Sequence, residues 1–393
     1  MIEASTLTAV IAGPPRRDVS SRMPLRALLA IASWALLSCA TFAQEAPSEP
    51  GSAPESASES ASEPGFRNGS FVLAPVPFHN PALDSGLALG GAYLFESDAE
   101  SDTSAVGAGG FRSLNGSRGL AAGFNLNLDS NRWKTTFLLG DLDLNYDLFV
   151  GGVPVPLNQS ARGVSAKVLY GVAPDLWFGA ALAYAKSTIQ GDGGAILPPS
   201  LTPDIDLELL KASLNGEFDR RDDSFYPTSG LLASGDLSFG AIPDGIFHGY
   251  GRNYVKGVAK ISRYSTVFGD GVFAWQAVGC AVSDEAPFFD ACALGGTDSL
   301  RGFSPTEFLD DALFSAQAEY RGRINRRFGY VAFVGAGSVD DDFVNALTSD
   351  YMVAGGIGAR IRLSSQFPLD YAVDVSLNQM GERILYISVG QNF

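Results

Sequence analysis

From about residue 66 to residue 393 the chain alternates between apolar and polar side chains, in segments of about ten residues separated by clusters of Gly, Pro, Asn and Asp. In residues 314–323 the apolar positions oppose a strongly polar set: Ser315, Gln317, Glu319, Arg321 and Arg323. The same period of two runs through residues 210–219 and 231–240. A period of two is the spacing at which side chains of a β-strand share one face. The sequence therefore predicts an all-β fold.

A soluble β-sandwich also alternates, but two features favour a membrane protein. Segments of about ten residues match a tilted transmembrane strand. The polar faces carry charges, as expected of a wet lumen behind a lipid-facing surface. Because lipid offers backbone groups no hydrogen-bond partner, only helices and closed barrels can span it. We therefore predict that residues 67–393 form a transmembrane antiparallel β-barrel in the outer membrane of a Gram-negative bacterium.

The alternation predicts fifteen strands, near residues 85–96, 104–113, 117–128, 131–148, 158–172, 175–190, 205–219, 229–241, 249–264, 269–283, 312–324, 328–338, 351–364, 369–378 and 383–393. Single-chain bacterial barrels usually have even strand counts, so sixteen strands are expected. The missing strand is expected at Phe71–Phe78 or within a merged Asn131–Leu148 segment.

The first 66 residues differ in composition from the rest. Ala27–Leu37 is the longest apolar run, follows several arginines and precedes Thr41-Phe42-Ala43. It predicts a signal peptide over residues 1–43 and is too short for a membrane anchor. A start at Met23, a lipoprotein site at Cys39 and a twin-arginine signal remain open alternatives. Residues 44–66, rich in Ser, Ala, Glu and Pro, are predicted to be a disordered linker.

Charge and motif content argue against several functions. A net charge of −16 argues against nucleic acid as a partner. His79 and His248 have no Cys or His neighbours at the spacing of metal ligands, so no metal site is predicted. The chain has no Gly-x-Ser-x-Gly motif. We therefore predict neither catalysis nor a cofactor.

A long connection, roughly residues 283–310, interrupts the strands, and a loop of this length is usually functional or disordered. It contains Arg301 between Leu300 and Phe303. A buried arginine in such surroundings needs carboxylate partners; the alternative is a solvated surface arginine. Cys280 and Cys292 flank the start of the loop. In an exported protein they form either a disulfide or two free thiols.

Two motifs of the chain resemble those of the bacterial surface antigen family, which includes BamA, TamA and the two-partner secretion transporters. One is the loop motif Gly296-Thr297-Asp298-Ser299-Leu300-Arg301-Gly302-Phe303. The other is the strand–turn motif, carried here by Asp219, Arg221, Asp222, Tyr226, Pro227 and Gly230. A weaker match covers residues 333–339, and the chain ends on Phe393, as members of this family do.

The resemblance implies a sixteen-stranded barrel whose long loop folds into the lumen, where Arg301-Gly302-Phe303 meets carboxylates of the inner wall. Glu319 stands where the family has its glutamate partner; the alternative is that Glu319 is a solvated lumenal charge. The family's second carboxylate falls at Gly335 here and is missing. Asp374 is expected to replace it.

The resemblance also implies a weakly paired seam between the first and last strands, here Leu87–Phe95 and Arg383–Phe393. Gly86, Gly90 and Gly91 are expected to weaken pairing there or simply to allow barrel curvature. Assembly and secretion members carry periplasmic POTRA domains, and the linker is too short for one. The chain therefore looks like a POTRA-less member.

The expected function is insertion or transport of protein or lipid at the outer membrane. The alternative is a passive pore or surface-structural barrel. The expected partners are outer-membrane lipid, the barrel assembly machinery for the chain's own insertion, and an unidentified periplasmic protein. The sequence leaves open what crosses the membrane and the oligomeric state.

Overall fold

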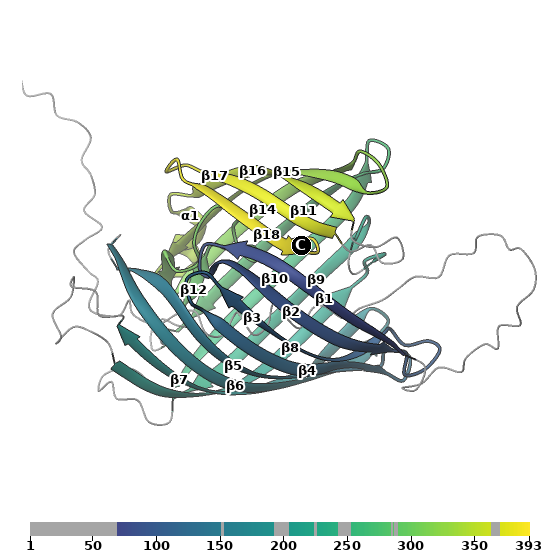
Figure 1. The fold of residues 1–393 in the computed structure, drawn as a ribbon, viewed down its shortest axis with the longest axis horizontal. Coiled ribbons are helices and arrows are strands. Elements are labelled where there is room, and N and C mark those ends of the chain that lie inside the picture. Colours follow the sequence, from purple (N-terminus) through teal and green to yellow (C-terminus); the bar gives the residue numbers. More distant parts are fainter. Residues whose placement is uncertain are drawn as a thin grey trace, which may run out of the picture.

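The computed structural model describes residues 69–150, 153–191, 204–223, 226–242, 253–283, 286, 290–362 and 370–393. The predicted signal peptide and linker lie outside these residues. The described residues form a closed antiparallel barrel of sixteen strands, drawn in Figure 1. The predicted fold class and strand number are therefore confirmed.

The wall runs in chain order, except that the lumenal strands β12 and β13 intervene between β11 and β14. Its strands are β1 (Ser70–Asn80), β2 (Asp84–Phe95), β3 (Ser104–Ser113), β4 (Arg118–Leu128), β5 (Trp133–Val150), β6 (Val153–Ala173), β7 (Leu176–Gly191), β8 (Asp204–Asp219), β9 (Gly230–Ala241), β10 (Asn253–Val267), β11 (Gly271–Val282), β14 (Ala312–Arg323), β15 (Phe328–Asp340), β16 (Met352–Arg362), β17 (Asp370–Asn378) and β18 (Arg383–Val389).

The strand missing from the sequence-based prediction is β1, at the first of the two expected places, whereas β5 is one continuous strand. The seam was therefore predicted with the correct last strand but the wrong first strand. The last strand, β18, meets β1, while Leu87–Phe95 belongs to β2 and is paired on both sides. Pro75 and Pro77 hide β1 in the sequence, because proline is rare within strands.

The side chains are sorted as a membrane barrel requires. Leu182 is 62% exposed and Leu214 is 58% exposed on the outer face, whereas Glu319 on the inner face is 1% exposed. An apolar exterior around a polar interior is the reverse of a soluble sandwich. Aromatic pairs, Trp133 with Tyr170 and Tyr320 with Tyr330, lie on this outer surface, as in the aromatic girdles of such barrels.

One part of the wall departs from this arrangement. In Figure 1 the ends of β5, β6 and β7 extend beyond the ends of β16 and β17 on the side where α1 lies. There the inward side chains of β5 are apolar and buried, while Asp141 and Asp147 point outward and are exposed. Side chains still alternate with a period of two, but here the inner face is apolar and the outer face is polar. We call this side of the barrel the loop end, and the opposite side the turn end.

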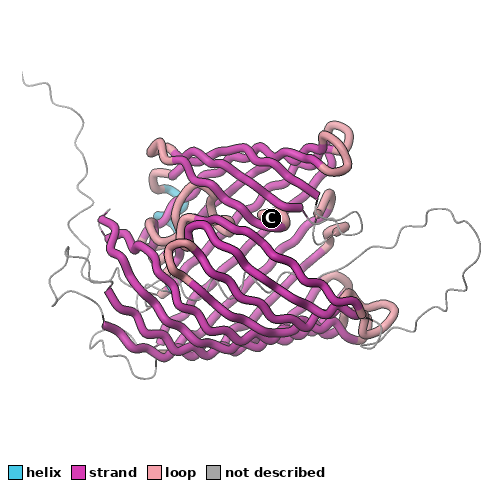
Figure 2. The backbone as a smooth tube through the Cα atoms, viewed as in Figure 1, coloured by secondary structure: helices cyan, strands magenta, loops and turns pink. Residues whose placement is uncertain are grey.

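Helix α1 (Phe343–Thr348) is the one helix of the described residues, shown in cyan in Figure 2. Its start is capped by Asp342, whose carboxylate accepts hydrogen bonds from the N–H groups of Val344 and Asn345. No helix in the described ranges is both long and apolar enough to cross a membrane.

Candidate functional site

The long connection between β11 and β14 folds into the lumen. Its two limbs pair as the short strands β12 (Cys292–Leu294) and β13 (Phe308–Asp310). Between them the backbone N–H of Gly296 donates to the carbonyl of Phe303 at 3.0 Å. Gly302 has φ +114°, and a Cβ there would lie 2.4 Å from the Cβ of Ala354. Only glycine fits this close approach to the wall.

Arg301 at the tip of this loop is fully buried and contacts three inward side chains. Its Nη2 donates to Glu319 Oε2 at 2.6 Å and its Nη1 to Asp374 Oδ2 at 3.2 Å. Its backbone N–H and Nε donate to Gln317 Oε1 at 3.2 and 3.3 Å. The structure thus brings together the arginine and the two carboxylates named from the sequence. A fork of fixed donors orients the loop as well as neutralising its charge.

Three further contacts fix the loop tip. The guanidinium of Arg301 stacks over the ring of Phe333 at 3.8 Å. The backbone N–H of Gly302 donates to the hydroxyl of Tyr386 at 3.0 Å, and the Gly302 carbonyl accepts from Asn378 Nδ2 at 2.9 Å. The tip is therefore held against β14, β15, β17 and β18.

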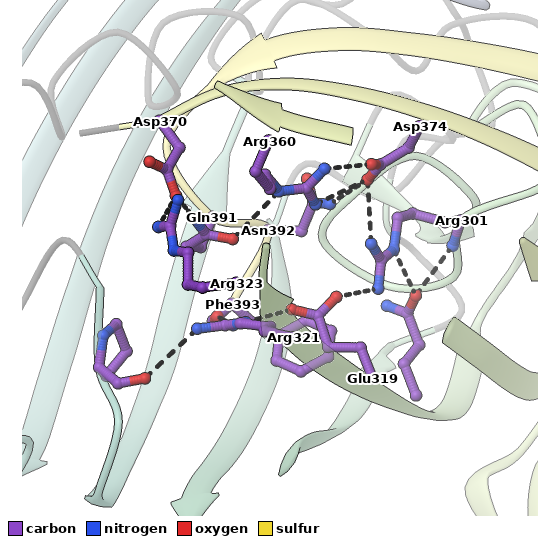
Figure 3. A network of polar contacts seen from close by, with 12 residues as sticks. Arg301, Glu319, Arg321, Arg323, Arg360, Asp370, Asp374, Gln391, Asn392 and Phe393 are labelled. Atoms are coloured by element: carbon purple, nitrogen blue, oxygen red, sulfur yellow. Dashed lines mark hydrogen bonds and ion pairs between the residues drawn. The ribbon is translucent and has the colours of Figure 1, made fainter. Parts of the chain in front are cut away.

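Each carboxylate also binds a second arginine, as Figure 3 shows. Glu319 Oε1 accepts from Arg321 Nε at 2.6 Å, and Asp374 Oδ2 accepts from Arg360 Nη2 at 3.1 Å. Arg321 continues to the strand–turn motif, since its Nη1 donates to the carbonyl of Pro227 at 3.4 Å. One polar network therefore joins the two motifs that carry the resemblance.

The strand–turn motif forms the floor of this network at the turn end. Asp219 pairs with Arg221 at 2.7 Å, and Asp222 accepts hydrogen bonds from the backbone of Thr228 and Ser229. A Cβ on Gly230, which has φ +111°, would lie 2.0 Å from a backbone oxygen. The ring of Tyr226 lies under the basic side chains that follow Arg321, with its centroid 4.5 Å from the guanidinium carbon of Arg323 and 5.4 Å from that of Arg362.

Phe393 does not continue the last strand, contrary to the sequence-based prediction. β18 ends at Val389, and Gly390 at φ +98° turns the chain. The ring of Phe393 then lies 5.5 Å from the guanidinium of Arg301, and its carbonyl accepts from Arg321. Phe393 is thus part of the lumenal network in Figure 3 rather than of the lipid-facing surface.

Gly335, where the family carboxylate is missing, leaves room for the loop. A Cβ at this position would lie 2.6 Å from Leu300 Cδ1 and 2.8 Å from Gln317 Cγ. Leu300 is fully buried. At Gly335 the wall therefore receives an apolar side chain of the loop instead of offering it a charge.

A second anchor, absent from the sequence-based prediction, holds the first limb of the loop. Asp290 Oδ1 accepts from Lys256 Nζ at 2.9 Å, and its Oδ2 accepts from Lys211 Nζ at 2.6 Å and from the hydroxyl of Tyr254. Burial raises the pKa of the Asp290 carboxyl, but the two ammonium groups outweigh burial and hold that pKa below its usual range. Lysines on the inward faces of two strands were the available sequence signal.

The disulfide that the sequence left open is present between Cys280 of β11 and Cys292 of β12. It lies two residues from Asp290, so covalent and ionic attachments hold the same limb.

Apolar side chains close the space between the loop and the projecting wall. Leu294, Leu300 and Phe303 of the loop share one buried cluster with inward residues of β5–β8: Leu142, Leu144, Tyr146, Leu148, Val155, Leu157, Ile189, Leu207 and Leu209. Within the described residues no group of three or more His, Cys, Asp or Glu is placed to hold a metal ion. The loop therefore fills the part of the lumen that lies beside β5–β8.

The barrel is weakly closed at one place. β1 and β18 share a single Cα pairing, His79 with Ile387, whereas β1 is in register with β2 along its whole length, from Ser70 to Asn80. Pro75 and Pro77 have no N–H, and residues two apart in an antiparallel strand direct their backbone groups to the same side. Because pairing with β2 is complete, we infer that the missing donors belong to the edge facing β18.

Comparison with solved structures shows the same fold. BamA from Haemophilus ducreyi lacking POTRA domains 1–3 has a TM-score of 0.59 and 13% identity, with 84% of this chain and 74% of that chain covered. CdiB from Escherichia coli has a TM-score of 0.55 and 13% identity, and CdiB from Acinetobacter baumannii 0.53 and 12%. These two matches cover 81% of this chain each, and 62% and 59% of the respective CdiB chains.

No curated protein matches the sequence. A sequence profile of the Omp85 superfamily domain matches residues 105–393, which is most of the chain and includes both motifs, the lumenal loop and the closing strand. The chain therefore belongs to the Omp85 superfamily, as a barrel of the Gram-negative outer membrane.

Proposed function

We propose that this barrel inserts or transports protein or lipid at the outer membrane by opening sideways between β1 and β18, without catalysis. The observation that carries the proposal is the single pairing of His79 with Ile387 in an otherwise fully paired wall. Each unpaired backbone group in lipid is costly, so a seam of this kind is a place where another strand or a lipid headgroup can enter.

The position of the loop supports this proposal. The tip carrying Arg301 is bound to β17 and β18 through Asp374, Asn378 and Tyr386. It thus braces the wall beside the seam from within. The loop and the apolar cluster around it occupy part of the lumen, which favours a lateral route over passive flow along the barrel axis.

The proposed partners follow from this route. Outer-membrane lipid contacts the exposed apolar face, and the barrel assembly machinery would insert the chain itself. A separate periplasmic protein would deliver a client to the turn end, which faces the periplasm because longer loops of such barrels lie outside the cell.

A disulfide across the seam tests the proposal. The variant His79→Cys with Ile387→Cys is refolded into liposomes, and the insertion rate of an unfolded outer-membrane barrel into these liposomes is measured. The reduced variant is expected to accelerate insertion as the wild type does, and the oxidised variant is expected to lose the acceleration. Each single-cysteine variant serves as the control for oxidation. Acceleration that survives cross-linking would overturn lateral opening.

Planar-bilayer conductance separates the proposal from a passive pore. Wild type is compared with a variant lacking residues 296–305. Low, flickering conductance that becomes large and steady in the variant is expected, because the loop folds into the lumen. A large, steady conductance in both would favour the pore.

A further inference from the structure

The outer face of the projecting wall carries a row of charges with a sharp lower edge. Cross-strand partners on β5, β6, β7 and β8 form this charged row: Asp141, Arg162, Lys186 and Glu208. The next row toward the turn end is apolar: Leu139, Val164, Tyr184 and Leu210. All four of these apolar side chains are exposed. Two residues along a strand, about 7 Å, separate the two rows.

This edge marks the level at which the wall leaves the membrane. Charged side chains on the lipid face cost a few kcal/mol at the midplane but little near the interface. Four adjacent strands change from apolar to charged between the same two rows of cross-strand partners. The charged row is therefore placed to meet lipid headgroups, next to acyl chains that contact the apolar row.

The arrangement of cations in this region is unusual for a chain with a net charge of −16. Arg162 stands directly opposite Lys186, and one row further out Arg112 stands directly opposite Arg118. Like charges directly opposite one another on a sheet are destabilising. Two such pairs, one on β3 and β4 and the other on β6 and β7 beyond β5, indicate that an anion can bind between the cations of a pair.

Carboxylates pair with three of these cations, but the paired cations stay exposed to solvent. Arg162 pairs with Asp141 at 2.8 Å and Arg118 with Asp143 at 3.0 Å, and Lys186 pairs with Glu208. The side chains of Arg118, Arg162 and Lys186 are nevertheless 71%, 81% and 62% exposed. Exposed ion pairs contribute little, so a doubly charged phosphate competes with them.

The surface here is hollowed. A concavity of about 1020 Å³ is lined by all four cations, Arg112, Arg118, Arg162 and Lys186, by four carboxylates, Asp141, Asp143, Asp206 and Glu208, and by Leu120 among the apolar residues. It offers room for a headgroup, and it lies above lipid-exposed side chains that hold the tails.

We propose that this concavity, the β4–β7 phosphate site, binds the phosphate-bearing headgroup of a lipid in the outer leaflet. The phosphate lies between Arg162 and Lys186, where Arg162 donates two parallel hydrogen bonds, and Arg112 and Arg118 bind a second phosphate or sugar oxygens. The acyl chains lie on Leu139, Val164 and Leu210. The lipid is the occupant because the site continues the lipid-facing belt without interruption.

Native mass spectrometry of the full refolded chain in a neutral detergent tests this site. Bisphosphorylated lipid A is titrated against the same lipid after enzymatic removal of its phosphates. The wild type is expected to bind the phosphorylated form roughly tenfold more tightly. The variant Arg162→Gln with Lys186→Gln is expected to lose that preference. The matched control is Arg326→Gln with Arg327→Gln, which removes the same charge from an exposed turn at the turn end and is expected to bind as the wild type does.

Equal binding of the two lipids by the wild type would overturn the proposal, and this comparison needs no variant. So would full retention of the preference in the double variant. If that variant does not refold, Arg112→Gln, which changes one exposed side chain, must weaken the preference. If the wild type instead forms dimers that cross-link through Lys186 and ignore phosphate, the concavity is a contact between copies and the lipid site is wrong.

Discussion

The lumenal loop is held at two places that use opposite kinds of ion. At its tip, Arg301 enters a wall that supplies two carboxylates, Glu319 and Asp374. On its first limb, Asp290 enters a wall that supplies two lysines, Lys211 and Lys256. A guanidinium stays charged in any protein environment, whereas a buried ammonium can release its proton. The tip anchor therefore cannot relax by titration, and the limb anchor can.

The largest expected effect is at the tip. Glu319→Gln keeps the shape of the side chain but leaves Arg301 and Arg321 facing each other without the shared carboxylate. Because neither arginine can lose its charge, we expect the free energy of unfolding to fall by about 3–5 kcal/mol. Urea unfolding in lipid vesicles, followed by tryptophan fluorescence, measures the change. Glu96→Gln, at an exposed position, is the control and should change nothing. A loss at Glu319 no larger than at Glu96 would show that the tip network does not stabilise the barrel.

The matched change at the limb anchor, Asp290→Asn, should cost less. It leaves Lys256 buried beside Lys211, but the buried ammonium can shed its proton. We expect a loss of about 2–3 kcal/mol at neutral pH, shrinking as the pH approaches 10, while the cost of Glu319→Gln stays constant. Asp350→Asn, at an exposed loop position, controls for the lost charge. Parallel pH dependence in the two anchors would contradict the distinction between arginine and lysine.

Acid should weaken the limb anchor specifically. The lysines hold the pKa of Asp290 below its usual range, and in the unfolded chain an aspartate has a pKa of about 3.9. A carboxyl whose pKa is lowered by folding stabilises the folded state at pH values above its pKa in the unfolded chain. This contribution is lost as the pH falls through its pKa in the folded chain. The difference in unfolding free energy between wild type and Asp290→Asn should therefore be constant above about pH 5 and narrow below pH 4. A difference that persists unchanged to pH 2 would contradict the assignment.

The two anchors also differ in how far the sequence reveals them. Arg301 stands in a contiguous motif and Glu319 lies on the polar face of the next strand, so the resemblance to the family could name both from the sequence. The partners of Asp290 lie 34 and 79 residues away. No local pattern connects them, because the folding of the loop into the lumen brings Asp290 against β8 and β10.

The fold, too, was predictable from the sequence only where it depends on local features. A period of two predicted most of the wall, because alternation is a local property of the chain. It failed for β1, where Pro75 and Pro77 interrupt the pattern, and for Phe393, which leaves the strand after Gly390. It also could not show that the lumen becomes apolar along Leu142 and Leu144. Alternation gives two faces but does not say which one meets lipid, water or another part of the chain.

The smallest expected effect concerns the apolar support of the tip anchor. In Gly335→Ala the new Cβ would lie 2.6 Å from Leu300 Cδ1 and 2.8 Å from Gln317 Cγ, so these side chains must move while Arg301 stays bound. We expect a loss of about 1 kcal/mol. Gly235→Ala is the matched control, because a Cβ there meets nothing within 4 Å. Thermal unfolding of both variants, with protease digestion of the loop, measures the effect. A loss at Gly335 with an intact loop would show that the ionic contacts of Arg301 position the tip by themselves. Protease cleavage between Gly296 and Pro305 would show that the contact of Leu300 with the wall at Gly335 is as necessary for the tip anchor as the charges are.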